Sequence, residues 1–269
     1  MYDFTYHRPA SLAEALNLLA EAEDPKIVAG GMTLLPTMKQ RLAQPSDLID
    51  LGGLGDMRGV NRDGDAFVVG AMTRHVEVAA NPELLAQLPA LAELAEMIGD
   101  PQVRNRGTMG GSVANADPAA DYPAAVVGLN ATVTTNQRSI AADDFFVDLF
   151  ETALEEDEII TSIRFPIVPR AAYMKFPNPA SRYAMVGVMV ADTAGGIRVA
   201  VTGAGPSVFR VAEMEAALGE DFSPEAVAGI RIPDDGLNED IHASAEYRAH
   251  LVTVMAKRAV LAVQARAAG

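Results

Sequence analysis

The chain has 269 residues, of which 49% are hydrophobic, so it can bury a sizeable core in one large or two small domains. Its formal net charge of −15 argues against nucleic acid as a partner, because such binding depends on neutralising phosphates with Lys and Arg. The absence of cysteine excludes disulfide bonds, a thiol nucleophile and a thiolate-bound iron–sulfur cluster on this chain.

The sequence shows neither a membrane segment nor a metal-binding pattern. Charges interrupt every apolar run before it reaches membrane-spanning length, and the first residues lack the basic and apolar regions of a secretion signal. We therefore expect no membrane span and a cytoplasmic location. Four scattered histidines lack metal-ligand spacing and are expected at the surface or in packing: His7, His75, His242 and His250. Any redox chemistry would need a bound organic cofactor.

The first fifty residues alternate between helix and strand signals. Ser11 begins a capping-box pattern that predicts a helix over 11–22, and residues 26–29 are typical of a short buried strand. Thr33 is the expected cap of a second helix, and residues 48–51 are a second strand. The buried face of that helix is expected to contain Leu34, Leu35, Met38 and Leu42. A Rossmann unit is a weak interpretation, because the G-x-G-x-x-G spacing is absent.

The next segment, up to about residue 130, is mainly helical in pattern. Residues 67–70 are strand-like, Thr73 can cap the helix that follows, and residues 99–107 are polar and turn-rich. Helices are predicted over 74–80, 83–98 and 118–130.

The remainder of the chain alternates hairpins with helices. Pro166–Pro169 is a candidate boundary between two parts of the molecule. Strands are predicted over 131–135, 138–140, 159–165, 184–191 and 197–203, and the last helix over roughly 244–267. These elements indicate an α+β architecture.

Two glycine pairs, Gly30-Gly31 and Gly110-Gly111, are the most informative local feature. A glycine pair lacks Cβ atoms and permits positive φ, so that successive backbone N–H groups can converge on an anion. A helix that follows such a turn adds free N–H groups. Hydroxyl and carboxylate groups near the glycines could contact a phosphate or a sugar: Thr33, Thr108, Ser112, Asp117 and Asp121.

Each of these residues also has an ordinary structural interpretation. A single Gly-Gly pair is commonly a tight turn, and Asp117 can equally be a simple N-cap. Arg104 and Arg106 are expected in structural ion pairs or partner contacts. The residues themselves therefore favour a phosphate-bearing cofactor and leave its identity open.

Taken together, the two glycine segments resemble the FAD-binding medium subunit of molybdenum hydroxylases. The pattern is similar to the medium chains of aerobic carbon monoxide dehydrogenase and of nicotine, nicotinate and xanthine dehydrogenases. The resemblance extends over nearly the whole chain. The motifs that carry it are AGGMTLLP at 29–36, DPQVRNRGTMGG at 100–111 and DPAAD at 117–121.

The resemblance implies a fold and a domain organisation. We expect a vanillyl-alcohol-oxidase-type (PCMH-type) FAD-binding domain over residues 1–168, with two lobes at about 1–52 and 53–168. A small α+β C-terminal domain of the carbon monoxide dehydrogenase flavoprotein type is expected over 169–269.

The resemblance also implies partners and an activity. The chain would be the FAD-dependent electron-transfer subunit of an oxidoreductase, between a small [2Fe–2S] subunit and an external acceptor. A large molybdopterin subunit would oxidise the substrate, in a dimer of heterotrimers. The lack of cysteine agrees with clusters on another chain. A stand-alone FAD-dependent oxidase or dehydrogenase and a non-catalytic scaffold subunit are the alternatives.

The resemblance assigns cofactor contacts residue by residue, with no side-chain catalyst. Both glycine segments would hold the diphosphate and ribityl chain, and Asn115 and Asp121 would contact ribityl or ribose hydroxyls. Ile98 and Ile160 would be apolar neighbours of the flavin and adenine. Lys175 and Tyr183 occur where the family has a lysine and an aromatic residue near the isoalloxazine, although 176–181 lack the basic run frequent in the family. The full set is Ile27, Val28, Ala29, Gly30, Gly31, Met32, Thr33, Leu34, Ile98, Thr108, Gly110, Gly111, Ser112, Asn115, Asp121, Ile160, Lys175 and Tyr183.

Overall fold

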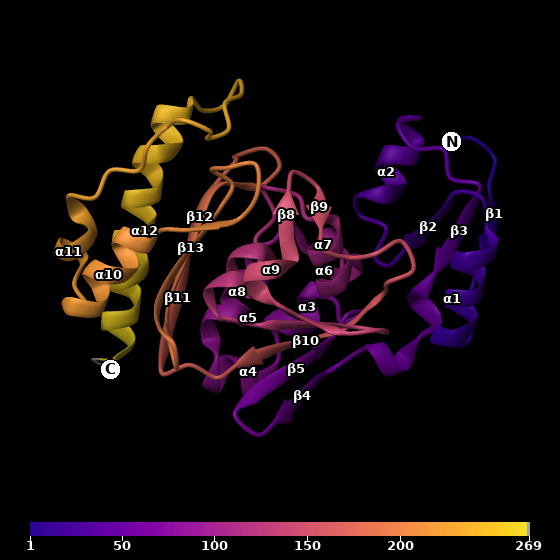
Figure 1. Ribbon diagram of the computed structural model, residues 1–269, viewed down its shortest axis with the longest axis horizontal. Coiled ribbons are helices and arrows are strands. Elements are labelled where there is room, and N and C mark those ends of the chain that lie inside the picture. Colours follow the sequence, from indigo (N-terminus) through magenta and orange to yellow (C-terminus); the bar gives the residue numbers. More distant parts are fainter. Residues whose placement is uncertain (268–269) are drawn as a thin grey trace.

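The computed structural model describes residues 1–267 and begins with a small parallel sheet in the order β1–β3–β2 (Figure 1). The strands and the helices beside them are β1 (Thr5–His7), α1 (Leu12–Glu21), β2 (Pro25–Val28), α2 (Leu34–Lys39) and β3 (Asp47–Asp50). The Ser11 hydroxyl accepts a hydrogen bond from the Glu14 N–H, as the capping pattern predicts. The Glu14 carboxylate accepts from the Ala10 N–H, one residue earlier than in a standard capping box.

A five-stranded antiparallel sheet follows, in the order β4–β5–β10–β6–β7. Two short 3₁₀ turns, η1 (Leu51–Gly53) and η2 (Gly55–Met57), lead into it. Its central strand β10 carries the fully buried Ile163 and Phe165 on one face, which is the two-residue period of a strand with one side in the core. The strands are β4 (Val60–Asp63), β5 (Ala66–Gly70), β6 (Thr132–Thr135), β7 (Ser139–Ala141) and β10 (Ile160–Pro166).

Short helices pack beside this sheet and connect its strands. They are α3 (His75–Ala79), α4 (Pro82–Gln87), α5 (Pro89–Glu96), α6 (Pro101–Arg106), α7 (Met109–Asn115), α8 (Tyr122–Gly128) and α9 (Ala142–Phe145). A two-stranded hairpin then leads back to β10, with strands β8 (Phe146–Asp148) and β9 (Glu151–Thr152).

Residues 170–267 form an antiparallel sheet with three helices packed beside it. The strands are β11 (Arg170–Pro177), β12 (Ala184–Thr193), β13 (Gly196–Thr202) and β14 (Phe209–Arg210). The helices are α10 (Ala212–Glu220), α11 (Pro224–Ala228) and α12 (Ala245–Ala267). Figure 1 shows this sheet between α12 and the helices α5 and α8 of the preceding part.

Both faces of this sheet are buried, and side chains alternate between two cores. Met189 and Ala191 on β12 belong to the large core of the first part, whereas Val188 and Val190 pack with α12 in a second core. The two parts therefore share an apolar interface through β11–β13. Among the described helices, none combines the length and the apolar character needed to cross a membrane.

Most predicted strands and the last helix are confirmed, but the helix predicted over 83–98 is wrong. It is two helices, α4 and α5, with Leu88 between them in a non-helical conformation. Pro89 causes the break, because proline lacks the N–H that would continue the hydrogen bonding and restricts the residue before it.

The turn-rich interpretation of residues 99–107 is also wrong. Helix α6 occupies most of this segment, capped by Asp100, whose carboxylate accepts from the Val103 N–H at 2.9 Å. An Asp-Pro pair supplies both an N-cap and a first helical residue, and these local signals outweigh the polar composition.

Three smaller expectations differ from the structure. The second glycine pair is not in a loop before a helix over 118–130: it lies inside α7, and α8 begins only at Tyr122. Thr73 does not cap α3, because its hydroxyl is bonded to the backbone of Gly59. Leu42 is 75% exposed, since α2 ends at Lys39 and the chain turns away.

Candidate cofactor-binding site

A cavity of about 620 Å³ lies where the end of β2, helix α7 and the start of β10 meet. Its walls come mainly from five separate parts of the chain, roughly 26–34, 71–75, 98–121, 152–160 and 181–183, with Leu51 beside them. The first lobe, the sheet-and-helix layer and the β11–β12 connection therefore all contribute to a single site.

The first glycine turn, residues 29–34, forms the wall at the end of β2. Gly31 has φ +72°, a left-handed conformation that side chains other than glycine rarely adopt. Gly30 lies against the segment before α7, because a Cβ on it would stand 2.6 Å from the Gly107 Cα. The sequence thus needs glycine at the first position for space and at the second for backbone conformation.

The backbone donors of this turn are free. Within residues 1–267, the N–H groups of Gly30, Gly31, Met32, Thr33 and Leu34 donate no hydrogen bond to backbone or side chain. Thr33 occupies the N-cap position of α2, but its hydroxyl makes no capping bond. Successive free N–H groups around a left-handed residue form an anion-binding concavity. This turn can therefore bind a diphosphate without a lysine.

The second glycine pair lies in helix α7, hereafter the glycine helix, and its N–H groups are already used. Gly110 donates to the Ala71 carbonyl at 2.8 Å, and Gly111 donates to the Thr108 hydroxyl at 3.2 Å. A Cβ on Gly110 would stand 2.5 Å from the Ala71 Cβ. The expectation that this pair presents converging N–H groups and positive φ is wrong. Close packing explains both glycines, because Gly110 lies against Ala71 and a Cβ on Gly111 would stand 2.8 Å from the Thr108 hydroxyl oxygen.

A buried ion pair lies beside the glycine helix. The Asp121 carboxylate accepts from Lys175 Nζ at 2.8 Å and from the Tyr173 hydroxyl at 2.5 Å. Both charged side chains are almost fully buried, at 4% and 3% exposed. Burial raises the pKa of Asp121, and the contacts with Lys175 and Tyr173 oppose that rise. Lys175 also donates to the Met97 carbonyl, so its ammonium is held in one place.

Asp117 and Tyr183 line the cavity near this ion pair. The Asp117 carboxylate accepts from the Ala119 N–H at 2.9 Å, so it closes a turn and does not cap a helix. Burial raises the pKa of Asp117. Burial and the nearby Asp117 carboxylate raise the pKa of Tyr183, which is 42% exposed. Tyr183 therefore stays a neutral, half-exposed aromatic side chain at the cavity wall.

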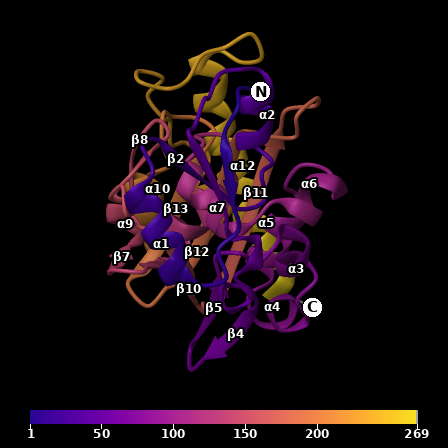
Figure 2. The same cartoon turned by 90° about the vertical axis from the view of Figure 1, so that its right-hand side faces the viewer.

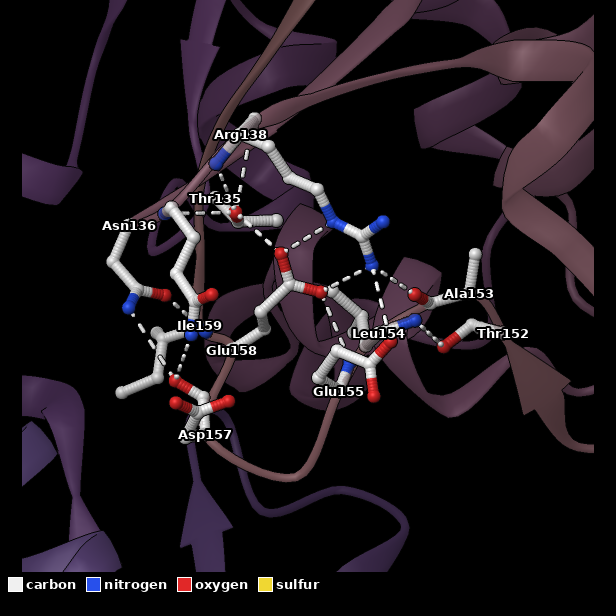
Figure 3. A network of polar contacts seen from close by, with 11 residues as sticks. Thr135, Asn136, Arg138, Thr152, Ala153, Leu154, Glu155, Asp157, Glu158 and Ile159 are labelled. Atoms are coloured by element: carbon white, nitrogen blue, oxygen red, sulfur yellow. Dashed lines mark hydrogen bonds and ion pairs between the residues drawn. The ribbon is translucent and has the colours of Figure 1, made fainter.

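A network of hydrogen bonds fixes the wall of the cavity formed by residues 152–160 (Figure 3). The Glu158 carboxylate accepts from Arg138 Nε at 2.8 Å, from the Thr135 hydroxyl at 3.0 Å and from the Glu155 N–H at 2.9 Å. The bonds from Arg138 are the main cause that lowers the pKa of Glu158 to about 2. The apolar wall formed by Leu154 and Ile160 is thereby held rigidly.

His75 is a buried side chain at the cavity wall. Its Nδ1 has no hydrogen-bond partner within the described residues, and its Nε2 lies against Gly107. Burial, assisted by the positive charge of Arg104, lowers the pKa of His75 to about 4. The imidazole is therefore neutral at pH 7. Arg104 itself pairs with Glu96 at 3.0 Å, which confirms its expected structural role.

The structure brings the predicted contact residues together with one exception. All of them line the cavity except Lys175, which lies behind Asp121. Whether they contact a cofactor stays a prediction. Sequence reasoning did not assign several other lining residues: Met72, His75, Val103, Leu154, Glu158 and Arg182. Of these, only Glu158 has a local sequence feature that could indicate its place, because it directly precedes the predicted strand at 159–165. In the described part of the chain, no group of His, Asp and Glu is placed to hold a metal ion.

Two family profiles match the chain. One, described as the FAD binding domain in molybdopterin dehydrogenase, covers residues 2–168. The other, described as the CO dehydrogenase flavoprotein C-terminal domain, covers residues 171–263. The cavity lies mainly within the first of these ranges, and its free backbone donors fit a diphosphate-bearing cofactor such as FAD.

Relatives and solved structures agree with these profiles over nearly the full length. The chain is 38% identical to the carbon monoxide dehydrogenase medium chain of Hydrogenophaga pseudoflava, covering 98% of each chain. It is 39% identical to the nicotine 6-hydroxylase medium subunit of Paenarthrobacter nicotinovorans, covering 97% of each. The solved carbon monoxide dehydrogenase of Hydrogenophaga pseudoflava superposes with a TM-score of 0.90, and quinoline 2-oxidoreductase of Pseudomonas putida 86, 28% identical, with 0.89. These two structures cover 98% and 99% of this chain, and 98% of each solved chain is covered.

Proposed function

The chain belongs to the FAD-binding medium subunits of the molybdenum hydroxylase family, and from this membership we propose that it transfers electrons inside a heteromeric enzyme. It is thus an FAD-dependent oxidoreductase subunit. In the proposed role it takes electrons from a [2Fe–2S] partner subunit and passes them to an external acceptor. The single observation that supports a cofactor-binding role most directly is the run of free N–H groups at Gly30–Leu34.

We place the FAD along the cavity. When bound, FAD supplies the redox chemistry, because it accepts electrons and passes them on. The first glycine turn would bind the diphosphate through its free N–H groups, and Ile98 and Ile160 would contact the flavin and adenine rings. Thr108, Ser112 and Asn115 would supply polar contacts from the glycine helix and its cap.

The ion pair of Asp121 with Lys175 would orient the polar end of the site. Each carboxylate oxygen of Asp121 already accepts one hydrogen bond, so a contact to the ribityl hydroxyls would use a remaining lone pair. Lys175 would act through Asp121, because it does not line the cavity. Tyr183 would cover the isoalloxazine from the β11–β12 connection.

The proposal includes the assembly and its domains. We assign an FAD-binding domain to residues 1–168, with lobes at about 1–52 and 53–168, and a C-terminal domain to 169–269. An iron–sulfur subunit and a large molybdopterin subunit would complete a dimer of heterotrimers in the cytoplasm. The lack of cysteine supports this division, because thiolate-bound clusters need another chain.

Two measurements test the proposal. The purified chain is expected to be yellow and to release FAD when it is denatured, as absorbance and chromatography of the released cofactor would detect. The chain is also expected to copurify with an iron–sulfur chain and a molybdenum chain. Colourless protein that takes up no FAD on reconstitution would contradict cofactor binding. A yellow chain that is isolated alone and turns over a small substrate would contradict the subunit role.

A further inference from the structure

The hairpin β8–β9 displays three large apolar side chains to solvent. Val147, Leu149 and Phe150 are 57%, 53% and 56% exposed. Phe150 has φ +54°, a left-handed conformation that bulky residues rarely adopt. Exposed apolar clusters of this kind mark interaction sites, and strained residues persist where the surrounding structure enforces them.

The segment that carries these apolar side chains is acidic. Residues 139–163 contain eight Asp and Glu residues and neither Lys nor Arg. Three of the eight carboxylates form ion pairs: Asp143 with Arg198 and Arg210, and Glu155 and Glu158 with Arg138. The other five are exposed and have no basic partner within the described residues: Asp144, Asp148, Glu151, Glu156 and Asp157.

The base of the hairpin is held in place before any partner binds. The rings of Phe145 and Phe146 pack edge to face with centroids 5.0 Å apart. The Ala153 N–H donates to the Phe145 carbonyl at 2.8 Å, and Arg138 donates to the Ala153 carbonyl at 2.7 Å, as Figure 3 shows for Arg138. A partner would therefore meet a preorganised surface and would lose little entropy in ordering it.

We propose that the hairpin β8–β9 is a docking element for one protein subunit of the complex, whose contact surface carries basic side chains around an apolar recess. The inference rests on the proposed function, because it needs a heteromeric complex. The apolar tip would enter the recess, and the unpaired carboxylates would face the basic rim. A second copy of this chain fits poorly, because a formal net charge of −15 places like charges opposite each other.

The hairpin lies next to the cavity, so a subunit docked on it would also affect access to the cavity. Thr152, the last residue of β9, and Leu154, two residues later, line the cavity. Figure 2 shows β8 and α6 on opposite sides of α7. A subunit on the hairpin would therefore cover the cavity beside β9 and leave the side beside α6 open to another contact.

The test uses this chain coexpressed with its iron–sulfur and molybdenum partner chains. One variant combines Leu149→Ser with Phe150→Asn, since Asn tolerates the left-handed backbone. A second combines Asp148→Lys with Glu151→Lys. Leu42→Ser is the matched control, because Leu42 is exposed in the other lobe. We expect at least tenfold weaker subunit association for both hairpin variants, with unchanged flavin content and unfolding transition. In the charge variant, the affinity of subunit association should also depend less on salt concentration than in the wild type.

The possible outcomes separate this inference from the proposed function. Unchanged association of both hairpin variants, in a complex that wild-type protein forms, would overturn the docking role alone. The same would follow if Leu42→Ser weakened association equally. Concentration-dependent dimerisation of the isolated chain that the hairpin variants abolish, seen by sedimentation, would assign the surface to a second copy and overturn the inference. Failure of the wild-type chain to bind any partner chain would overturn both proposals.

Discussion

The two glycine pairs of this chain have the same dipeptide sequence, but the structure requires glycine for a different reason in each. In the first glycine turn, Gly31 adopts a left-handed backbone and the neighbouring N–H groups are free. In the glycine helix, Gly110 and Gly111 are helical, and their N–H groups are bonded to Ala71 and Thr108. One pair exposes backbone donors, and the other allows two parts of the chain to approach closely.

A glycine pair can therefore contribute to a binding site in two ways. The first glycine turn can bind an anion directly, whereas the glycine helix positions a wall of the cavity. Changes near the glycine helix should therefore lower the stability of flavin-free protein. A change in the first glycine turn should mainly lower the affinity for flavin.

The largest effect is expected from Asp121→Asn, beside the glycine helix. The substitution would leave the Lys175 ammonium buried without its carboxylate, a change that costs about 3–5 kcal/mol. Urea unfolding of flavin-free protein measures it. If Asp121→Asn left flavin-free stability unchanged and reduced only flavin affinity, Asp121 would belong functionally with the first glycine turn.

The second prediction concerns pH and His75, which packs on Gly107 before the glycine helix. Its pKa is lowered from 6.5 to about 4 in the folded chain, so the unfolded chain binds the proton more tightly. The resulting stability is present above pH 6.5 and is lost as the pH falls towards 4, by about 3 kcal/mol in total.

His75→Leu removes this titration. We expect the free energy of unfolding of the wild type to fall more steeply between pH 6.5 and 4 than that of the variant, measured by urea unfolding of flavin-free protein at each pH. Parallel pH profiles would show that His75 is accessible to protons in the folded chain, against the burial seen in the structure.

The third prediction concerns packing of the glycine helix. Gly110→Ala places a methyl group 2.5 Å from the Ala71 Cβ, and overpacking of this kind costs about 1–3 kcal/mol. Gly219→Ala in α10 is the matched control, because among the described residues no atom beyond the neighbouring helix backbone lies within 4 Å of its Cβ position. The control should stabilise the helix by about 0.5–1 kcal/mol. Equal stability of the two variants would contradict the packing explanation.

Local signals in the sequence predicted most of the elements that build the site. The apolar runs at β2, β10, β12 and β13, with the glycine turn at 193–196 between the last two, were sufficient to place these strands. Two errors had local causes that were available in the sequence: Pro89, which divides a helix, and Asp100-Pro101, which begins one.

Other features depend on contacts between distant residues and could not be predicted from local pattern. Asp121 and Lys175 are 54 residues apart in sequence and meet only because the sheet that contains β11 packs on α5 and α8. The packing of Gly110 on Ala71 likewise needs the tertiary structure. Both glycine pairs are predicted as equivalent turns, because a local sequence pattern does not show which backbone N–H groups form tertiary hydrogen bonds.

The smallest expected change in stability belongs to Gly31→Ala in the first glycine turn. Alanine at φ +72° costs about 1–2 kcal/mol, and the nearest neighbours of the added Cβ would be side-chain atoms of Leu35 and Val28, with no backbone among them. Displacement of one aligned N–H group should weaken FAD binding by a further factor of about ten, since 1.4 kcal/mol corresponds to tenfold in affinity. Flavin fluorescence titration of the reconstituted chain measures this, and Gly31→Asn, which tolerates the left-handed backbone, should retain more of the affinity. If Gly31→Ala lowered stability but left the affinity for FAD unchanged, the first glycine turn would have only a structural role. The two glycine pairs would then not differ in function.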